Sequence, residues 1–443
     1  MYLLSIKTMP VYLRLRKHLP KGGFLSNVFT LMTGTVLSQV IMVITTPIIT
    51  RLYNPDDFGM LALYTSVTGI FTVVASWRYD QAIMLPKEDK QAINILALSI
   101  SITFTMAFII LLVMAFARNF IANLLDSEKL SFWLWFSPLG VLFGGLYQSL
   151  NYWSTRKKSF RFNAVSRISQ SIATAGITIA IAVLFKPTAG GLIVGFIFGT
   201  SIGILVLFIQ IWRDGQLKLF GNVNKSDMWS NAVEYKKFPY FDSWSGLLNS
   251  VSLQVPVFLF SRFFTQEVVG FYSLANRILL LPSTIIGQSV RQVSFQRSAE
   301  LYASSMPIKR SFLRSTYGLI VVSILPFSII LLFGKPIFSL VFGADWATAG
   351  LYAQILSFWF FSKFITPPAS VLWIVFRKQD KIIIWDGFLF ILRILSILIG
   401  YYLFNNAEKS LMLFSTVGFV FNLILIGYGF HWISIYSIVK RDS

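Results

Sequence analysis

The chain has 443 residues, of which 55% are hydrophobic and only 13% are charged, and its formal net charge is +20. Soluble domains usually carry about 25% charged residues, so this composition excludes an ordinary soluble protein. The basic residues lie in short stretches between apolar runs, which is typical of membrane topology and not of nucleic-acid binding. The chain has no cysteine and only two histidines, His18 and His431, so we expect neither disulfides nor a metal site.

Long apolar runs follow one another along the whole chain. Runs of about 20 residues are long enough to cross roughly 30 Å of hydrocarbon, and helices satisfy every backbone polar group within lipid. The sequence therefore predicts an all-α integral membrane protein with about twelve transmembrane helices. Their approximate limits are residues 26–50, 59–85, 91–117, 130–153, 163–185, 190–212, 239–261, 270–290, 313–333, 349–376, 381–403 and 411–438.

Lysine and arginine alternate between the two sides of these spans. The N-terminal segment, every second loop and the C-terminus together hold 26 of the 38 basic residues, whereas the intervening loops hold seven. Because basic residues accumulate on the cytoplasmic side, this distribution predicts that both termini are cytoplasmic. The remaining five basic residues fall inside predicted spans.

Two short fragments are repeated half a chain apart. RLYNPDDFGMLALY, from Arg51, resembles RFFTQEVVGFYSLA, from Arg262, and NYWSTRKKSFRF, from Asn151, resembles VLWIVFRKQDKI, from Val371. The fragments occupy matching loops of two six-helix halves, which predicts two lobes related by a pseudo-two-fold axis along the membrane normal. The first fragment reads as a tight turn and helix start in both copies.

These patterns give a division of the chain into five segments. Residues 1–25 form a cytoplasmic basic N-terminal segment, and residues 26–213 form an N-lobe with six helices. A cytoplasmic linker follows at residues 214–238. The C-lobe, also with six helices, covers residues 239–438, and a cytoplasmic tail covers residues 439–443.

The cations inside spans are candidate substrate-binding groups. A charged side chain at mid-bilayer costs about 2.5–3.5 kcal/mol on insertion scales, so each needs a partner, water or a function. Arg277, Lys363 and Arg393 lie deepest, while Arg78 and Arg167 lie nearer the cytoplasmic ends. A cavity with these groups would attract an anionic substrate such as a phosphate ester.

Acidic residues within the spans are fewer and shallower. Asp80, Asp242 and Asp386 all fall near the cytoplasmic face, where they are candidate counter-ions or coupling groups. Pro47 and Pro256 lie near the outer ends of the first and seventh spans and are candidate gating kinks, since proline removes an intrahelical hydrogen bond.

A family resemblance rests on the N-terminal spans. TPIITRLYNPDDFGMLALYTSVTGI, from Thr46, followed by WRYDQAIMLPKED, from Trp77, resembles the signature of the Wzx-type oligosaccharide flippases of the multidrug/oligosaccharidyl-lipid/polysaccharide exporter superfamily. The resemblance is densest over about residues 26–95. It implies two six-helix lobes around a central V-shaped cavity, bent first and seventh helices, and a cavity role for Arg78.

The same resemblance implies a function without covalent chemistry or cofactor. It implies that undecaprenyl-diphosphate-linked oligosaccharide repeat units cross from the cytoplasmic to the periplasmic leaflet of the bacterial inner membrane by alternating access, for O-antigen, capsule or exopolysaccharide assembly. The implied partners are this lipid-linked oligosaccharide, membrane lipids, and a polymerase and chain-length regulator of the same pathway.

Several alternatives stay open at this stage. A cation-coupled multidrug exporter of the same superfamily would be expected to carry a deep acidic residue, and the first, third and eighth predicted spans contain none. A lipid II flippase generally has two more helices. A membrane glycan polymerase or ligase would carry a large extracytoplasmic loop, whereas the longest outward loops here have about 15 residues. A nucleotide-driven pump would need a phosphate-binding glycine loop, which is missing.

Overall fold

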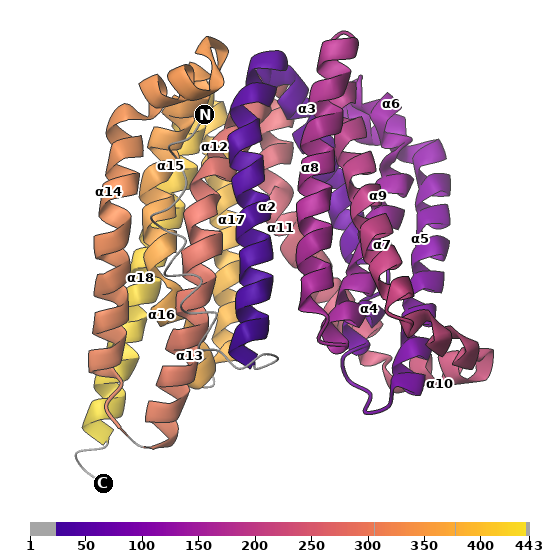
Figure 1. Ribbon diagram of the computed structural model, residues 1–443. Coiled ribbons are helices and arrows are strands. Elements are labelled where there is room, and N and C mark those ends of the chain that lie inside the picture. The colour runs from indigo at the N-terminus through magenta and orange to yellow at the C-terminus, as the bar shows by residue number, and fades with distance from the viewer. Residues whose placement is uncertain (1–23, 305, 377, 440–443) are drawn as a thin grey trace, which may run out of the picture.

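The computed structural model describes residues 24–304, 306–376 and 378–439, and this part of the chain contains helices and no strands. Two helical bundles stand side by side, the N-terminal one indigo to magenta and the C-terminal one salmon pink to yellow (Figure 1). The predicted all-α class and the two lobes are therefore confirmed. We call the end with the turns at residues 52–55 and 263–266 the turn end, and the opposite end, which includes α4 and α10, the basic end.

The N-lobe begins with a long helix and ends with a short segment that leads to the second lobe. Its helices are α2 (Phe24–Leu52), α3 (Pro55–Val73), α4 (Tyr79–Ala82), α5 (Asp89–Leu124), α6 (Leu130–Leu134), α7 (Ser137–Arg156), α8 (Phe160–Leu184) and α9 (Ala189–Arg213). The connection holds the 3-10 helix η1 (Gln216–Asn222) and α10 (Lys225–Glu234).

The C-lobe repeats this plan of successive helices. It comprises the π-helix η2 (Phe238–Asp242), α11 (Ser243–Phe263), α12 (Gln266–Pro282), the π-helix η3 (Ser283–Gly287), α13 (Gln288–Ala303), α14 (Lys309–Phe342), the 3-10 helix η4 (Ala344–Trp346), α15 (Ala347–Ile365), α16 (Pro367–Val375), α17 (Gln379–Phe404) and α18 (Ala407–Val439).

The helices are consistent with twelve spans. Within the described ranges, seven helices are each long and apolar enough to cross a membrane, and the pair α15 and α16, bent by 43°, counts as an eighth. Helices α3, α7, α11 and α12, with 17 to 21 residues each, occupy the positions of the other four predicted spans.

Several predicted helix limits were wrong, for identifiable reasons. The predicted span 59–85 breaks after Val73, because Trp77 and Arg78 adopt positive φ angles of 50° and 63°. The break is stabilised locally: the Ser76 hydroxyl donates to an Asp80 carboxylate oxygen at 2.7 Å. Arg78 therefore lies in a turn and not in a helix.

Proline accounts for two further differences. The predicted span 130–153 divides before α7, which carries a proline in its first turn, and the predicted span 349–376 bends where Pro367 begins α16. The predicted span 270–290 continues through η3 into α13 as far as Ala303. Helix α13 is polar, so hydropathy gave no sign that the helix extends beyond the membrane.

The repeated turn is built by the same type of cap in both lobes. Asn54 and Asp57 form a capping box, in which the Asn54 side chain accepts from the Asp57 backbone N–H at 2.9 Å and the Asp57 carboxylate accepts from the Asn54 N–H at 3.3 Å. Pro55 occupies the first turn of α3. In the second copy, the Thr265 hydroxyl accepts from the Val268 N–H at 3.3 Å. The predicted tight turns are therefore present.

Helices α3 and α12 cross where the two lobes meet. A Cβ atom added to Gly59 would collide with the Gln266 carbonyl oxygen, and one added to Gly270 would collide with the Pro55 carbonyl oxygen. In the repeat, residue 55 corresponds to residue 266, and residue 59 corresponds to residue 270 at the same offset. The two close approaches are therefore two copies of one contact. The pseudo-two-fold axis therefore runs between α3 and α12, and only glycine allows this approach.

This geometry predicts unequal effects of three glycine substitutions. Gly59→Ala and Gly270→Ala should lower the thermal unfolding midpoint of the purified protein, because forcing apart a close-packed contact costs roughly 1–3 kcal/mol. Gly69→Ala, in the same helix α3, should leave the midpoint unchanged or raise it slightly, since no atom lies within 4 Å of the added Cβ. Equal midpoints for Gly59→Ala and Gly69→Ala would contradict the close contact.

Candidate functional site

Two of the predicted cavity cations meet on one tryptophan in the C-lobe. The Lys363 Nζ atom of α15 lies 5.2 Å from the ring centroid of Trp359, and the Arg393 Cζ atom of α17 lies 4.9 Å from the same centroid. Helix α18 completes the group through Phe414, whose ring lies 5.1 Å from Trp359 and 5.6 Å from Arg393 Cζ. Trp359 is only 6% exposed, so these cation–π contacts form in a largely desolvated place.

The charge of this cluster is not neutralised by a contacting acid. Within the described residues, ion pairs join Asp89 to Arg156 and Lys157, and Glu300 to Arg297, and none includes Lys363 or Arg393. Lys363 and Arg393 repel each other electrostatically, and Asp386 attracts Arg393 without forming an ion pair. The Arg393 Nε atom is buried without a hydrogen-bond partner. A buried guanidinium N–H of this kind suits an anionic oxygen of a ligand.

Arg277 is separate from that cluster. It lies eleven residues after the start of α12 and is half-buried, and no described carboxylate forms an ion pair with it. The structure therefore leaves Arg277 as a second unneutralised cation in the C-lobe, without a contact to Lys363 or Arg393.

The two predicted N-lobe cations take part in packing between helices. Arg167 Nη1 donates to the Thr35 hydroxyl at 3.0 Å and so joins α8 to α2. The Arg78 guanidinium lies against Gly246 of α11, where an added Cβ would collide with it, so it bridges the lobes near the basic end. Only two of the five predicted cations therefore come together.

The three predicted acids differ sharply in their surroundings. Asp80 is fully buried, and its Oδ2 atom has no hydrogen-bond partner, although Arg78 interacts with it electrostatically. Asp242, at the end of η2, and Asp386, in the second turn of α17, are both exposed. Among the three, Asp80 is the buried one.

The helices with the predicted kinks carry polar contacts between the lobes. Pro47 and Pro256 lie inside α2 and α11, each of which runs as one helix across its proline. Gln39 Nε2 of α2 donates to the Thr284 hydroxyl of η3 at 3.3 Å. The Oε1 atom of Gln254 in α11 accepts from the Ser66 hydroxyl of α3 at 2.7 Å. A gating role of the prolines stays a prediction.

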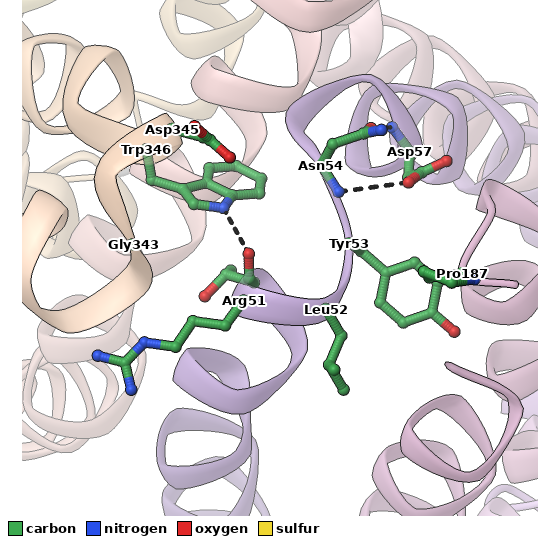
Figure 2. A pocket seen from close by; sticks show the side chains of 10 residues that line it. Arg51, Leu52, Tyr53, Asn54, Asp57, Pro187, Gly343, Asp345 and Trp346 are labelled. Carbon is green, nitrogen blue, oxygen red and sulfur yellow. Dashed lines mark hydrogen bonds between the residues drawn. The ribbon is translucent and has the colours of Figure 1, made fainter. Parts of the chain in front are cut away.

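Residues from both lobes also close around a small pocket at the turn end. It has a volume of about 270 Å³ (Figure 2). Trp346 Nε1 of the C-lobe donates to the Thr50 carbonyl of α2 at 2.8 Å, and Arg51 Nη2 donates to the Leu340 carbonyl of α14 at 2.9 Å. We call these two hydrogen bonds the turn-end latch. Trp346 was not predicted from the sequence, because an aromatic residue in a short loop resembles an ordinary interfacial residue.

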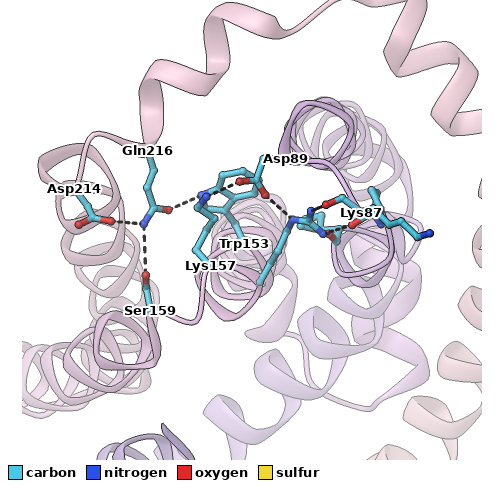
Figure 3. A network of polar contacts seen from close by, with 10 residues as sticks. Lys87, Asp89, Trp153, Lys157, Ser159, Asp214 and Gln216 are labelled. Carbon is cyan, nitrogen blue, oxygen red and sulfur yellow. Dashed lines mark hydrogen bonds and ion pairs between the residues drawn. The ribbon is translucent and has the colours of Figure 1, made fainter. Parts of the chain in front are cut away.

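A second polar network fixes the basic end of the N-lobe (Figure 3). Asp89 at the start of α5 accepts from Arg156 Nε at 3.2 Å and from Lys157 Nζ at 2.7 Å. The buried Trp153 donates through Nε1 to Gln216 Oε1 at 2.9 Å. From the sequence, Arg156 and Lys157 were predicted only as topology signals. Trp153 belongs to a repeated fragment, but its hydrogen bond to Gln216 was not predicted.

Sequence comparison connects this fold to glycan pathways. The chain matches a family described as polysaccharide biosynthesis protein over residues 48–350. It is 24% identical over 363 residues to the succinoglycan biosynthesis transport protein ExoT of Rhizobium meliloti, covering 77% of this chain and 67% of that protein. It is 26% identical over 194 residues to the teichuronic acid biosynthesis protein TuaB of Bacillus subtilis, covering 44% and 38% respectively.

Solved structures of two transporters share the fold. An inward-facing multidrug resistance MATE family transporter of the MOP superfamily has a TM-score of 0.68 at 12% identity, over 92% of this chain and 95% of that chain. The lipid II flippase MurJ in an inward closed conformation has a TM-score of 0.68 at 14% identity, over 93% and 91%. With the family match covering more than half of its length, the chain belongs to the family described as polysaccharide biosynthesis protein.

Proposed function

We propose that this protein moves undecaprenyl-diphosphate-linked oligosaccharide repeat units from the cytoplasmic to the periplasmic leaflet of the bacterial inner membrane. The observation that carries the proposal is the pair of cations, Lys363 and Arg393, that share Trp359 without a neutralising acid in contact. The family and the transport function of the relative ExoT support a glycan as the cargo. A diphosphate is the part of such a substrate that matches two unneutralised cations.

Each part of the substrate would have a different environment. The diphosphate would bind at Arg393 and Lys363, where low dielectric strengthens its attraction to the cations. The glycan would occupy the aqueous space between the lobes, and the polyprenyl chain would stay in lipid through a lateral gap. Arg277, Arg78 and Arg167 would add positive potential along the path. No bond forms or breaks, so the free energy of binding and release governs the step.

Alternating access requires the lobes to part at one end while they meet at the other. In this structure the turn-end latch and the contact between α3 and α12 join the lobes at the turn end. We take residues 26–213 and 239–438 as the two moving units. The linker moves with the N-lobe, because the Tyr79 hydroxyl donates to the Ala232 carbonyl at 2.8 Å and Gln91 Nε2 donates to Asn231 Oδ1 at 3.1 Å.

In this proposal, the distribution of basic residues determines how the protein is oriented in the membrane. Their excess at one end places that end, and both termini, in the cytoplasm. Repeat units would then be collected at the basic end and released at the turn end. A polymerase and a chain-length regulator that use the released units are the expected partners.

The cation cluster gives a direct prediction. Arg393→Ala and Lys363→Ala should each reduce the export of the glycan at least about tenfold, because losing one charge-assisted contact to a phosphate costs about 1.5–3 kcal/mol. The measurement is surface glycan in a host that lacks the native gene, normalised to the amount of variant in the membrane. Lys409→Ala is the matched control, since Lys409 makes a similar contact, 4.5 Å from the Phe404 ring, at the turn end. Normal export by both cluster variants would remove the basis for this site.

Substitutions of Trp359 distinguish the contribution of the aromatic ring from the contribution of the two cations. Trp359→Phe should retain most of the export, because a ring still faces both cations, whereas Trp359→Leu should reduce it toward the level of Arg393→Ala. Both variants should be quantified in the membrane, since Trp359 also packs against Gly418 of α18. Equal export by the two variants would show that the ring does not position the cations.

The substrate and the direction of movement are tested by depletion in the native host. Complete single repeat units on the diphosphate lipid should accumulate, and they should be protected from glycan-modifying enzymes added to the periplasmic side. Accumulation on the periplasmic side would instead indicate polymerisation or ligation. Unchanged lipid-linked glycans would favour a cation-coupled drug exporter, for which the buried Asp80 would be the first residue to examine.

A further inference from the structure

A second cationic site lies on the outer flank of the C-lobe, away from the proposed path. A groove of about 720 Å³ runs along the first turns of α14, which stands at the edge of the bundle (Figure 1). Three basic and three less polar side chains line it, namely Lys309, Arg310 and Arg314 with Pro307, Leu313 and Tyr317.

The length of α14 sets the depth of this groove in the membrane. Helix α14 has 34 residues, so it is longer than a span requires. The 21 residue steps from Arg314 to Lys335 correspond to about 32 Å at 1.5 Å per step, close to the roughly 30 Å of the hydrocarbon core. Arg314 therefore lies at the level of the lipid headgroups, with Lys309 and Arg310 just outside it.

The side of α14 that continues from the groove faces lipid. Tyr317, Val321, Leu325 and Leu332 are spaced along one side of the helix, and Tyr317 and Leu325 are 69% and 68% exposed. An exposed apolar stripe of this length is compatible with contact to acyl chains but not with water. The groove thus opens both to the headgroup layer and to the hydrocarbon directly below it.

The three cations of the groove have no partner among the residues that the structure describes. Among the described residues, no hydrogen bond or ion pair involves the side chain of Lys309, Arg310 or Arg314, and the acid Glu300 at the end of α13 is paired with Arg297 at 3.4 Å. A topology signal alone requires cations on the correct side of the membrane. It does not require that they converge on a groove with an apolar wall.

We propose that this groove binds the headgroup of an anionic phospholipid of the surrounding bilayer. The phosphate lies among Lys309, Arg310 and Arg314, and the first acyl carbons lie against Leu313 and Tyr317. The charge of the ligand follows from the three cations, and its lipid character from the depth of the groove and the exposed stripe below it. Such a lipid would hold the basic end of α14 at a fixed height in the membrane and is independent of the transported substrate.

Native mass spectrometry of the full-length protein, released from detergent in the presence of phosphatidylglycerol or phosphatidylcholine, tests this proposal. The wild type should retain phosphatidylglycerol in preference to phosphatidylcholine. The triple variant K309Q/R310Q/R314Q should retain phosphatidylglycerol about tenfold less well, because each basic residue near an anionic headgroup contributes to its binding. The R310K/R314K variant keeps the charge and should retain most of the binding.

The matched control removes the same charge from the linker, which packs on the other lobe. K225Q/K236Q/K237Q neutralises three exposed lysines at the basic end, in and just after α10, and should retain phosphatidylglycerol like the wild type. Equal loss in both triple variants would show a nonspecific charge effect and would overturn the proposal. Equal retention of phosphatidylcholine, or preferential retention of an added polyprenyl diphosphate, would also overturn it. Glycan export is measured separately, so failure here leaves the flippase proposal standing.

Discussion

The crossed contact of α3 and α12 determines how the two lobes can move. Because Gly59 and Gly270 allow each helix to approach the backbone of the other, the two lobes come into backbone contact near their common axis. In the proposed alternating access, this contact would act as a pivot, since it fixes position without the interlocking of long side chains. The repeated fragment that contains both glycines would then encode a joint and not a binding site. The two turns at residues 52–55 and 263–266 then have only the role of starting α3 and α12.

The cations deep in the C-lobe follow a different physical rule. A protein that needed Arg393 and Lys363 only for stability would pair them with acids, because an isolated charge in the membrane is costly. Here an aromatic ring, Trp359, compensates part of that cost without removing the charge. Asp386 acts from the exposed second turn of α17 and is too far away to neutralise Arg393 by contact. Under the proposed function, this cluster would keep its positive potential available to a ligand.

The sequence predicted the features that depend on hydropathy, charge bias and repetition. These were the positions of the spans, the matching of the halves and the tight turn that begins at Arg51. It could not predict the break at Trp77 and Arg78, because neither residue type marks a left-handed turn and the turn depends on local contacts such as the hydrogen bond from Ser76 to Asp80. It also could not pair Lys363 with Arg393. That pairing requires α15, α17 and α18 to pack around Trp359, and no local pattern records it.

The turn-end latch has the strength that a reversible closure requires. The buried Trp346 hydrogen bond to a carbonyl contributes about 0.5–1.5 kcal/mol, and the exposed Arg51 hydrogen bond contributes no more than a similar amount, because solvent screens its charge. Their sum is a few kcal/mol, which a ligand can overcome through a difference in its affinity for two conformations. Both bonds end on backbone carbonyls, which water can satisfy once the lobes part. A buried ion pair at the same place would leave two desolvated charges on opening, and the closed state would then be difficult to leave.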